Sequence, residues 1–189
     1  MLRRSLLTSA IAASLLTTFS LPAFATQVYE TDLVIIGGGL SGLAAAQSAV
    51  DQGAKPIVLE KEAALGGGGN FPEGSLGVGT RYQKEHNINT TVDQVLTAAL
   101  QYHHYRADPH VLRVLIEESG KTIDWVMDKG AQMRGIRTMY PKDESLMTWH
   151  LFKGGAAGII QRFAKEVRAK GGTILTETPA KKLIVENGK

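Results

Sequence analysis

The chain has 189 residues, of which 43% are hydrophobic, and it carries a formal net charge of +3 at pH 7 and no cysteine. The absence of cysteine excludes disulfides, thiolate catalysis, cysteine-ligated zinc and covalent haem attachment within this chain. Arg3 and Arg4 supply two of the positive charges, and the remaining charges form no block of one sign. The composition therefore indicates no nucleic-acid partner.

The first 25 residues have the pattern of an export signal rather than of a folded element. Arg3 and Arg4 form a charged start, residues 6–21 are apolar with Ala, Ser and Thr, and Ala23-Phe24-Ala25 matches a small-x-small cleavage pattern. We predict a signal peptide over residues 1–25 and an exported, periplasmic protein. No later stretch is apolar for long enough to cross a bilayer, so no membrane span is expected after cleavage. The arginine pair is compatible with both the twin-arginine and the ordinary secretory route.

A strand, a glycine-rich turn, a helix and a second strand follow in that order. Residues 33–36 are apolar and largely β-branched, as expected for a strand buried on both faces of a parallel sheet. Residues 40–52 are rich in Ala and Leu, contain no Pro and precede Gly53, which suits a left-handed helix cap. Residues 56–59 form the second apolar strand, which ends at Glu60.

The turn carries the G-x-G-x-x-G spacing on Gly37, Gly39 and Gly42. The first glycine permits the tight turn, the second lets the backbone approach a pyrophosphate, and the third lets helix and strand pack closely. The free N–H groups and positive dipole end of the helix suit the phosphates. Glu60 is placed to accept hydrogen bonds from ribose hydroxyls, and its charge favours FAD or NAD over NADP. The alternative is a glycine-rich turn that only links a strand to a helix.

A second glycine-rich stretch, residues 66–70, follows the second strand, and Gly74 and Ser75 come shortly after it. So many glycines would be costly in chain entropy for a plain linker. They suit a backbone that lies against a flat ligand and points N–H groups at it. The alternative is a flexible surface loop.

Residues 32–45, Leu59-Glu60-Lys61 and residues 66–70 together resemble the FAD-binding domain of the fumarate reductase/succinate dehydrogenase flavoprotein superfamily. The likeness is strongest to its soluble exported members, such as flavocytochrome c-type fumarate reductases and urocanate reductases. It continues through residues 106–109, residues 122–126, and His150 with residues 154–158.

The resemblance implies an α/β fold, a Rossmann-like FAD-binding domain with a central parallel sheet and a β-meander start. Residues 26–189 would be its N-terminal part, apparently truncated at the C-terminus, because members of this family continue into a capping domain and a C-terminal FAD segment. The pattern Asn187-Gly188 after an apolar run also predicts a hairpin turn that lacks its returning strand.

The resemblance further implies the residues that contact FAD. Leu40 and Ser41 would flank the pyrophosphate, Glu60 would hold the ribose, and the later residues would pass near the flavin. Gly68-Gly69 stands where relatives often have Asn followed by Ser or Ala, so a side-chain hydrogen bond there is lost or moved to Asn70. The full predicted set is Gly37, Gly38, Gly39, Leu40, Ser41, Gly42, Glu60, Lys61, Gly67, Gly68, Gly69, Asn70, Gly74 and Ser75.

By the same resemblance, the parent protein would be an FAD-dependent oxidoreductase that reduces the C=C bond of a fumarate-like small-molecule enoate by hydride transfer from flavin N5. Electrons would come from a separate donor such as a cytochrome, since this chain has no haem motif. The family's catalytic residues would lie beyond Lys189, so the catalytic residues are unknown. Two alternatives stay open: another FAD dehydrogenase on the same scaffold, of 3-ketosteroid or amine type, and a non-catalytic dinucleotide-binding remnant.

The sequence predicts helices in the middle of the chain. Apolar residues recur with helical spacing from residue 92, after Thr90-Thr91 as candidate caps, and Asp108-Pro109 marks a second start. Ser119 is a candidate cap for a third helix, with Gly130 after its end. No metal site is predicted, because the adjacent His103 and His104 are poorly placed to share an ion. The residues expected to face inward from the second helix are Val111, Leu112, Leu115 and Ile116.

In residues 133–151 the apolar residues do not recur with the regular spacing of a helix or a strand. His150 lies near the flavin or substrate in one interpretation and is an ordinary polar loop residue in the favoured one. After it we expect a helix from Gly158 to the Gly171-Gly172 pair and strands over residues 173–178 and 183–185.

Overall fold

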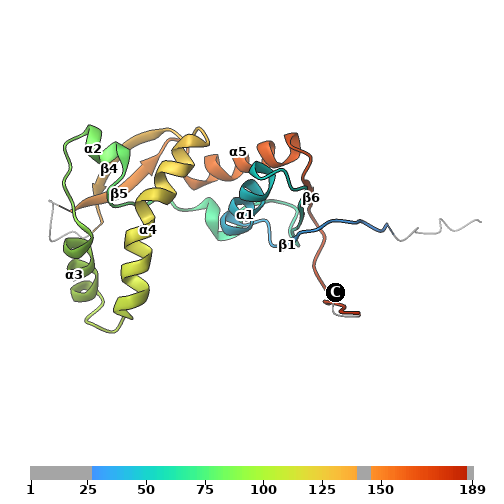
Figure 1. Ribbon diagram of the computed structural model, residues 1–189, viewed down its shortest axis with the longest axis horizontal. Helices are drawn as coiled ribbons and strands as arrows, with labels where there is room; N and C mark the ends of the chain where they lie inside the picture. The colour runs from blue at the N-terminus through green and yellow to red at the C-terminus, as the bar shows by residue number, and fades with distance from the viewer. Residues whose placement is uncertain (1–26, 140–145, 187–189) are drawn as a thin grey trace, which may run out of the picture. The chain divides into compact units, whose positions relative to one another are not determined.

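Three short parallel strands form the sheet beside the first glycine motif. A computed structural model describes residues 27–139 and 146–186. Strands β1 (Val34–Ile36), β2 (Ile57–Leu59) and β6 (Thr173–Leu175) form one sheet in the order β1-β2-β6. Helices α1 (Leu40–Asp51) and α5 (Gly155–Ala169) pack against each other (Figure 1). This arrangement confirms the α/β fold with a parallel sheet.

The main core lies between α1, α5 and the C-terminal half of α4 (Pro109–Asp128). Trp125 of α4 packs against Phe163 of α5, with ring centroids 5.2 Å apart. Burying one such large apolar side chain contributes roughly 1.5–3 kcal/mol, so this cluster decides which face of each helix turns inward. Its buried members are Leu43, Ile123, Val126, Phe152, Ile159, Ile160, Phe163 and Ala164.

One acidic side chain ties the C-terminal ends of the three core helices together. Asp51 of α1 lies 2.6 Å from the Nζ of Lys129, just after α4, and 2.7 Å from the Nζ of Lys170, just after α5. These hydrogen bonds, from Lys129 first and Lys170 second, lower the pKa of Asp51 to about 2.

Strand β1 differs from the prediction in its burial. Val34 and Ile36 are 53% and 71% exposed, whereas Val58 of β2 is fully buried. Ile35 packs under α1, so its two neighbours point to the opposite face, because side chains alternate along a strand. No described helix covers that face, and β1 lies at the edge of the described sheet. The prediction that β1 is buried on both faces is therefore wrong for the described residues. An apolar run does not show whether another helix or strand covers each face.

A second, antiparallel sheet forms where the sequence shows no clean period. Strands β3 (Gly74–Leu76), β4 (Met133–Thr138) and β5 (Met147–Phe152) lie in the order β3-β5-β4. Antiparallel pairing, which the fold prediction placed in a β-meander at the start, is thus found in mid-chain. Strand β5 buries alternate residues, but two of the buried ones are the polar Thr148 and His150. Because these buried residues are polar, the alternation of apolar and polar residues that identifies a strand is absent from the sequence.

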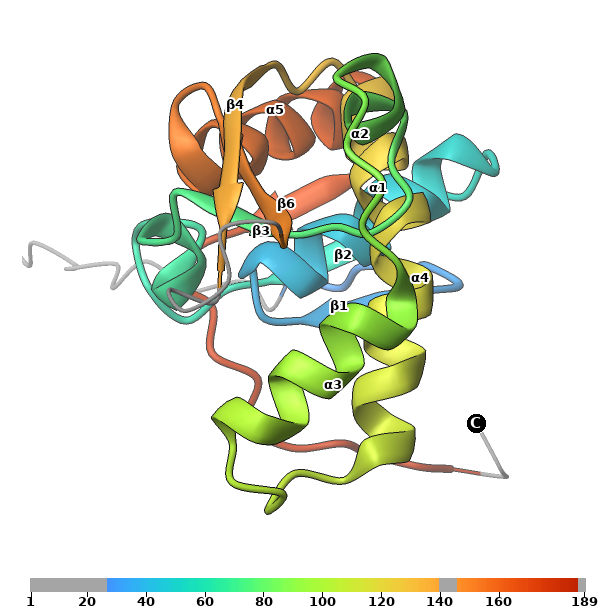
Figure 2. The same cartoon turned by 90° about the vertical axis from the view of Figure 1, so that its left-hand side faces the viewer.

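The helices of the middle segment begin at the expected caps. Helix α3 (Val92–Tyr102) starts with a capping box at Thr91, and the Asp108 carboxylate accepts from two N–H groups at the start of α4. Both predicted starts are confirmed. Helix α2 (Arg81–Glu85) has a capping box at Thr80, which the sequence interpretation missed. Helix α3 lies beside the N-terminal half of α4 (Figure 2).

Helix α4 corrects two expectations. It runs without interruption through Ser119, whose hydroxyl donates to the Ile116 carbonyl at 2.6 Å and accepts from the Val78 N–H at 3.1 Å, so Ser119 caps no third helix. Val111 and Leu115 are 66% and 57% exposed rather than inward-facing. The inward stripe of this half of α4 is narrow, and Ile116 is buried in a cluster with α3, Val78 and Leu146.

The end of the chain also differs from expectation. No strand forms over residues 183–185, which are exposed, and β6 is shorter than predicted. The predicted signal peptide and the turn at Asn187-Gly188 lie outside the described residues. Among the residues that are described, no helix combines the length and the apolar character needed to span a membrane.

Candidate functional site

The turn between β1 and α1 leaves the start of α1 open. The Gly37 N–H donates to the Leu59 carbonyl at 2.7 Å, and the first bond within the helix runs from the Leu43 N–H to the Gly39 carbonyl at 2.9 Å. Helices α2, α3 and α4 have side-chain caps, whereas α1 and α5 have none. The N–H groups of Leu40 and Ser41 therefore bond to no described residue. An uncapped helix start of this kind is suited to an anion.

Glycine is required in this turn by close packing. A Cβ on Gly42 would overlap the carbonyl oxygen of Gly37, so the helix could not approach the strand. A Cβ on Gly38 would lie 2.6 Å from Cδ2 of Leu65. A Cβ added to Gly39 would lie 3.8 Å from its nearest neighbour outside the adjoining residues, the Gly66 carbonyl oxygen, so this side of Gly39 is open to a ligand.

Glu60, at the end of β2, is joined to this turn. It is only 8% exposed, and its carboxylate accepts from the Gly38 N–H at 2.7 Å and from the Glu62 N–H at 2.9 Å. These backbone hydrogen bonds, from Glu62 first and Gly38 second, lower the pKa of Glu60, so it is ionised at neutral pH. A carboxylate has about four acceptor sites, and two therefore remain for other donors. The neighbouring Lys61 is exposed and pairs with Glu62 at 3.3 Å.

The second glycine-rich stretch lies directly beside the first. The Gly66 N–H donates to the Gly38 carbonyl at 2.9 Å, and Gly66 forms a parallel bridge with Gly39. The turn η1 (Gly67–Asn70) then passes the start of α1, where a Cβ on Gly69 would lie 3.1 Å from the Cβ of Leu40. The sequence predicts both glycine segments, and the structure adds that they are neighbours.

Asn70 closes that turn on itself. Its side-chain amide donates to the Leu65 carbonyl at 2.9 Å and lies over Gly66. Gly67 and Gly68 have open space where a Cβ would be, so nothing in the described protein fills the outer side of this turn.

The last two predicted site residues lie on β3 and are held by the antiparallel sheet. A Cβ on Gly74 would overlap the carbonyl oxygen of His150, and the exposed Ser75 pairs with His150 across the two strands. The Pro72 carbonyl also accepts from the Ala156 N–H, at 2.9 Å, at the start of α5. No hydrogen bond among the described residues joins β3 to the first glycine turn.

His150 is not a loop residue. It is fully buried in β5, with Nε2 2.8 Å from Oγ1 of Thr80 and Nδ1 3.0 Å from the Thr148 carbonyl oxygen. Burial lowers the pKa of His150. The sequence interpretation missed its partner Thr80 and the Gln83 side chain that bonds Thr80, although the spacing T-x-x-Q before a helical segment is the capping-box signal.

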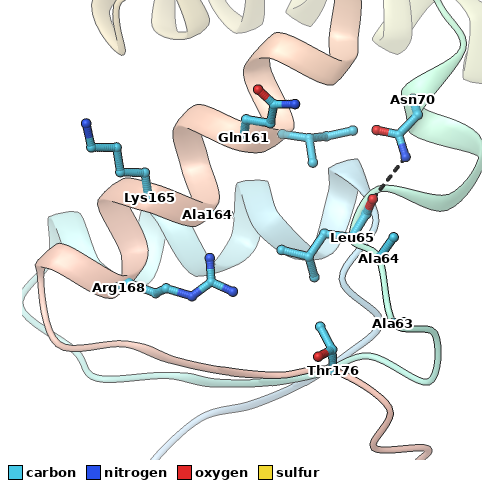
Figure 3. A pocket seen from close by; sticks show the side chains of 10 residues that line it. Ala63, Ala64, Leu65, Asn70, Gln161, Ala164, Lys165, Arg168 and Thr176 are labelled. Atoms are coloured by element: carbon cyan, nitrogen blue, oxygen red, sulfur yellow. Dashed lines mark hydrogen bonds between the residues drawn. The ribbon is translucent and has the colours of Figure 1, made fainter.

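A pocket of about 670 Å³ lies beside the second glycine stretch (Figure 3). Its apolar wall includes Leu65 and Ala164, and Asn70 is the only member of the predicted cofactor set that lines it. In Figure 3 the guanidinium of Arg168 extends toward Leu65, while the ammonium of Lys165 extends away from it. The glycine turn at residues 37–42 and Gly69 lie around the start of α1 rather than in this pocket.

Comparisons with known proteins agree with this geometry. A family model described as "FAD binding domain" matches residues 32–189. The chain is 35% identical over 150 residues to a vinyl phenol reductase of Lactiplantibacillus plantarum, covering 79% of this chain and 30% of that protein. It is 31% identical over 119 residues to a fumarate reductase (cytochrome) of Shewanella frigidimarina, covering 62% of this chain and 21% of that protein.

Solved structures share the fold. The open conformation of a flavocytochrome c3 fumarate reductase aligns with a TM-score of 0.69 at 21% identity, covering 83% of this chain and 28% of that one. A 3-ketosteroid dehydrogenase from Rhodococcus jostii aligns with a TM-score of 0.67 at 20% identity, covering 82% of this chain and 39% of that one. This chain thus spans less than half the length of each protein compared. It belongs to the FAD binding domain family, and FAD is its cofactor.

Proposed function

We propose that this chain is the FAD-binding portion of an exported flavoprotein reductase and that the two adjacent glycine-rich segments form its dinucleotide site. The observation that carries this proposal is the uncapped start of α1 beside the buried carboxylate of Glu60. The first feature suits a pyrophosphate and the second a pair of ribose hydroxyls, and both lie at the carboxyl ends of adjacent parallel strands.

The residues present fit FAD in charge and in space. The N–H groups of Leu40 and Ser41 would donate to the pyrophosphate, which can approach because Gly39 has no side chain. The two unused acceptor sites on Glu60 would take the ribose hydroxyls, and the same charge would repel a 2′-phosphate. Lys61 would lie at the outer rim of this adenosine end.

The flavin end would run along the second glycine segment. Gly67 and Gly68 leave backbone uncovered on the outer side of η1, Gly69 packs against Leu40 at the start of α1, and Asn70 is already bonded to its own loop. Strand β3, with the buried Gly74 and the exposed Ser75, would lie beyond them. When bound, FAD supplies the hydride-transfer chemistry, and the protein supplies position and electrostatics.

The proposed reaction of the whole protein is reduction of the C=C bond of a fumarate-like enoate. Support comes from the two similar reductases, at 35% and 31% identity. Electrons would come from a separate donor such as a cytochrome, and the protein would act in the periplasm after export. A reductase or dehydrogenase of 3-ketosteroid type is the competing function, because the fold is equally that of the aligned 3-ketosteroid dehydrogenase.

A charge placed at the start of α1 tests the site. Ser41 is exposed in the first turn of α1, so Ser41→Asp should stabilise the helix dipole by roughly 0.3–1 kcal/mol while repelling a bound pyrophosphate. We expect the Kd for FAD, from quenching of flavin fluorescence, to rise about tenfold, while the thermal midpoint of the ligand-free chain does not fall.

His110→Asp is the matched control, because it adds a negative charge to the exposed first turn of α4. It should leave the Kd for FAD unchanged. Equal effects of the two substitutions would place the pyrophosphate away from α1. Preference for NAD over FAD in the same titration would contradict the flavin proposal.

The substrate class needs the full-length protein. We expect oxidation of a reduced viologen dye with fumarate or another small enoate as acceptor. Activity with a 3-ketosteroid but not with fumarate or urocanate would support the competing function. No turnover with any acceptor, in a protein that holds FAD, would support a non-catalytic dinucleotide-binding role.

A further inference from the structure

The segment that joins β3 to α2 is enclosed on two sides. On one side a Cβ on Gly77 would lie 2.8 Å from the ring of His150. On the other, a Cβ on Gly120 would overlap the Val78 carbonyl oxygen, and the Val78 N–H donates to the hydroxyl of Ser119 at 3.1 Å. The segment is therefore held between β5 and α4, and its position determines where β3 lies.

Its last residue, Thr80, belongs to a chain of hydrogen bonds whose directions can be assigned. Nε2 of Gln83 donates to the Met147 carbonyl at 2.7 Å, so Oε1 of Gln83 is the acceptor for the Thr80 N–H at 3.1 Å. The Gln83 N–H donates to Oγ1 of Thr80 at 3.0 Å. The Thr80 hydroxyl then has two acceptors within reach, Oε1 of Gln83 at 3.4 Å and Nε2 of His150 at 2.8 Å, and the shorter contact is the one to Nε2.

The other side of the imidazole fixes its tautomer. Nδ1 of His150 lies 3.0 Å from the carbonyl oxygen of Thr148, which can only accept, so Nδ1 carries the hydrogen. The same carbonyl accepts from the Gly77 N–H at 2.9 Å. A neutral ring with its hydrogen on Nδ1 therefore satisfies both contacts at once and links β5 to Thr80, while the Thr148 carbonyl joins β5 to Gly77 at the other end of the segment.

This ring stands next to the strand that is proposed to meet the flavin. His150 pairs with Ser75 across β3 and β5, and its carbonyl faces Gly74 so closely that no side chain fits between the strands. We propose that His150 is a positioning residue for the cofactor site, whose neutral Nδ1–H ring holds β3 where Gly74 and Ser75 meet the flavin. This inference rests on the proposed placement of the flavin end.

Protonation would change this arrangement. A hydrogen on Nε2 would face the Thr80 hydroxyl, whose own hydrogen would have to turn to Oε1 of Gln83, 3.4 Å away, and share that oxygen with the Thr80 N–H. The charged and titratable groups that face the ring are Tyr82 of α2, edge-on with ring centroids 6.0 Å apart, and the carboxylate of Asp124 on α4. Neither forms a hydrogen bond to the ring, and Asp124 already accepts from the Arg81 N–H. A buried imidazolium would thus lack a contacting counter-ion, and burial accordingly lowers the pKa of His150 below its ordinary value of 6.5.

The test measures FAD affinity against pH with the full wild-type chain, from pH 8 to pH 5. We expect the Kd for FAD to stay constant at the alkaline end and to rise about tenfold as His150 takes up a proton, in a single-proton transition. Nitrogen-15 NMR of the imidazole should report the Nδ1–H tautomer at pH 8 in the ligand-free chain. A transition in the histidine signal at the same pH as the change in Kd would link the two.

Three variants make the test specific. Thr80→Ser keeps the hydroxyl and should retain the wild-type Kd and pH profile, whereas Thr80→Val should weaken FAD binding about tenfold at pH 8 and speed hydrogen exchange in β3. His110→Gln, at an exposed histidine, should leave the profile unchanged. An Nε2–H tautomer, a flat pH profile, or faster exchange in β3 without a change in Kd would each overturn the inference. Failure of the wild-type chain to bind FAD at pH 8 would instead refute the proposed function, and the tautomer would still be measured.

Discussion

Replacing Glu60 by glutamine tests the central feature of the site without using any ligand. The carboxylate accepts two backbone N–H groups, one from Gly38 across the glycine turn and one from Glu62 in its own strand end. The two N–H groups bond different oxygens of the carboxylate, so in glutamine one of them would face the NH₂ group in place of an acceptor. Because the side chain is only 8% exposed, water cannot easily take the place of the lost acceptor.

The expected loss of stability follows from the loss of one hydrogen-bond acceptor. Leaving one buried N–H without its acceptor costs about 1–3 kcal/mol, so we expect Glu60→Gln to lower the free energy of unfolding by about 2 kcal/mol at pH 7. With a urea dependence of about 2 kcal/mol/M for a domain of this size, the midpoint should fall by about 1 M. Circular dichroism of the full chain in urea measures this directly. Glu62→Gln is the control, because it removes the same charge from an exposed side chain.

The difference between wild type and Glu60→Gln should also depend on pH. The two backbone hydrogen bonds lower the pKa of Glu60 in the folded protein below its ordinary value of 4.5. The ionised carboxylate therefore stabilises the fold above pH 4.5, and this contribution is lost as the pH falls through the lower, folded pKa. Equal midpoints for the two proteins at pH 7, or a gap that does not close in acid, would refute the reasoning.

Three further substitutions have definite expectations, each measured by urea unfolding. Gly42→Ala should cost about 3 kcal/mol, because the new methyl group overlaps a carbonyl oxygen of the turn, and a cost below 1 kcal/mol would contradict that overlap. Asp51→Asn should cost about 1 kcal/mol at pH 7, and the gap should close as the pH falls from 3.8 through the folded pKa of about 2; a gap that persists at pH 2 would argue against the two lysine contacts. Ile36→Ser should change stability by less than about 0.5 kcal/mol, while Val58→Ala costs about 2 kcal/mol, and the reverse order would mean that β1 is buried in solution.

Features that depend on near neighbours in the chain were predictable. Asp108-Pro109 starts α4 and Gly53 ends α1, because capping and left-handed backbone conformation are settled by a few adjacent residues. The glycine spacing around Gly39 likewise predicted the strand–turn–helix unit. Features that depend on distant partners were missed. Strand β5 could not be recognised because the polar Thr148 and His150 occupy buried positions, and the hydroxyl that contacts the His150 ring belongs to Thr80, far away in the chain.

In the candidate site, too, some features depend on near neighbours in the chain and others on distant partners. The order of residues predicts two glycine-rich segments after two apolar strands and an acidic residue at the end of the second strand. It does not predict that Gly66 bonds to Gly38, that the Glu60 carboxylate bonds to the glycine turn, or that β1 lies at the edge of the described sheet. The reason is physical: steric and capping preferences act over a few residues, whereas hydrogen-bond partners and burial are set by packing between segments that lie far apart in the chain.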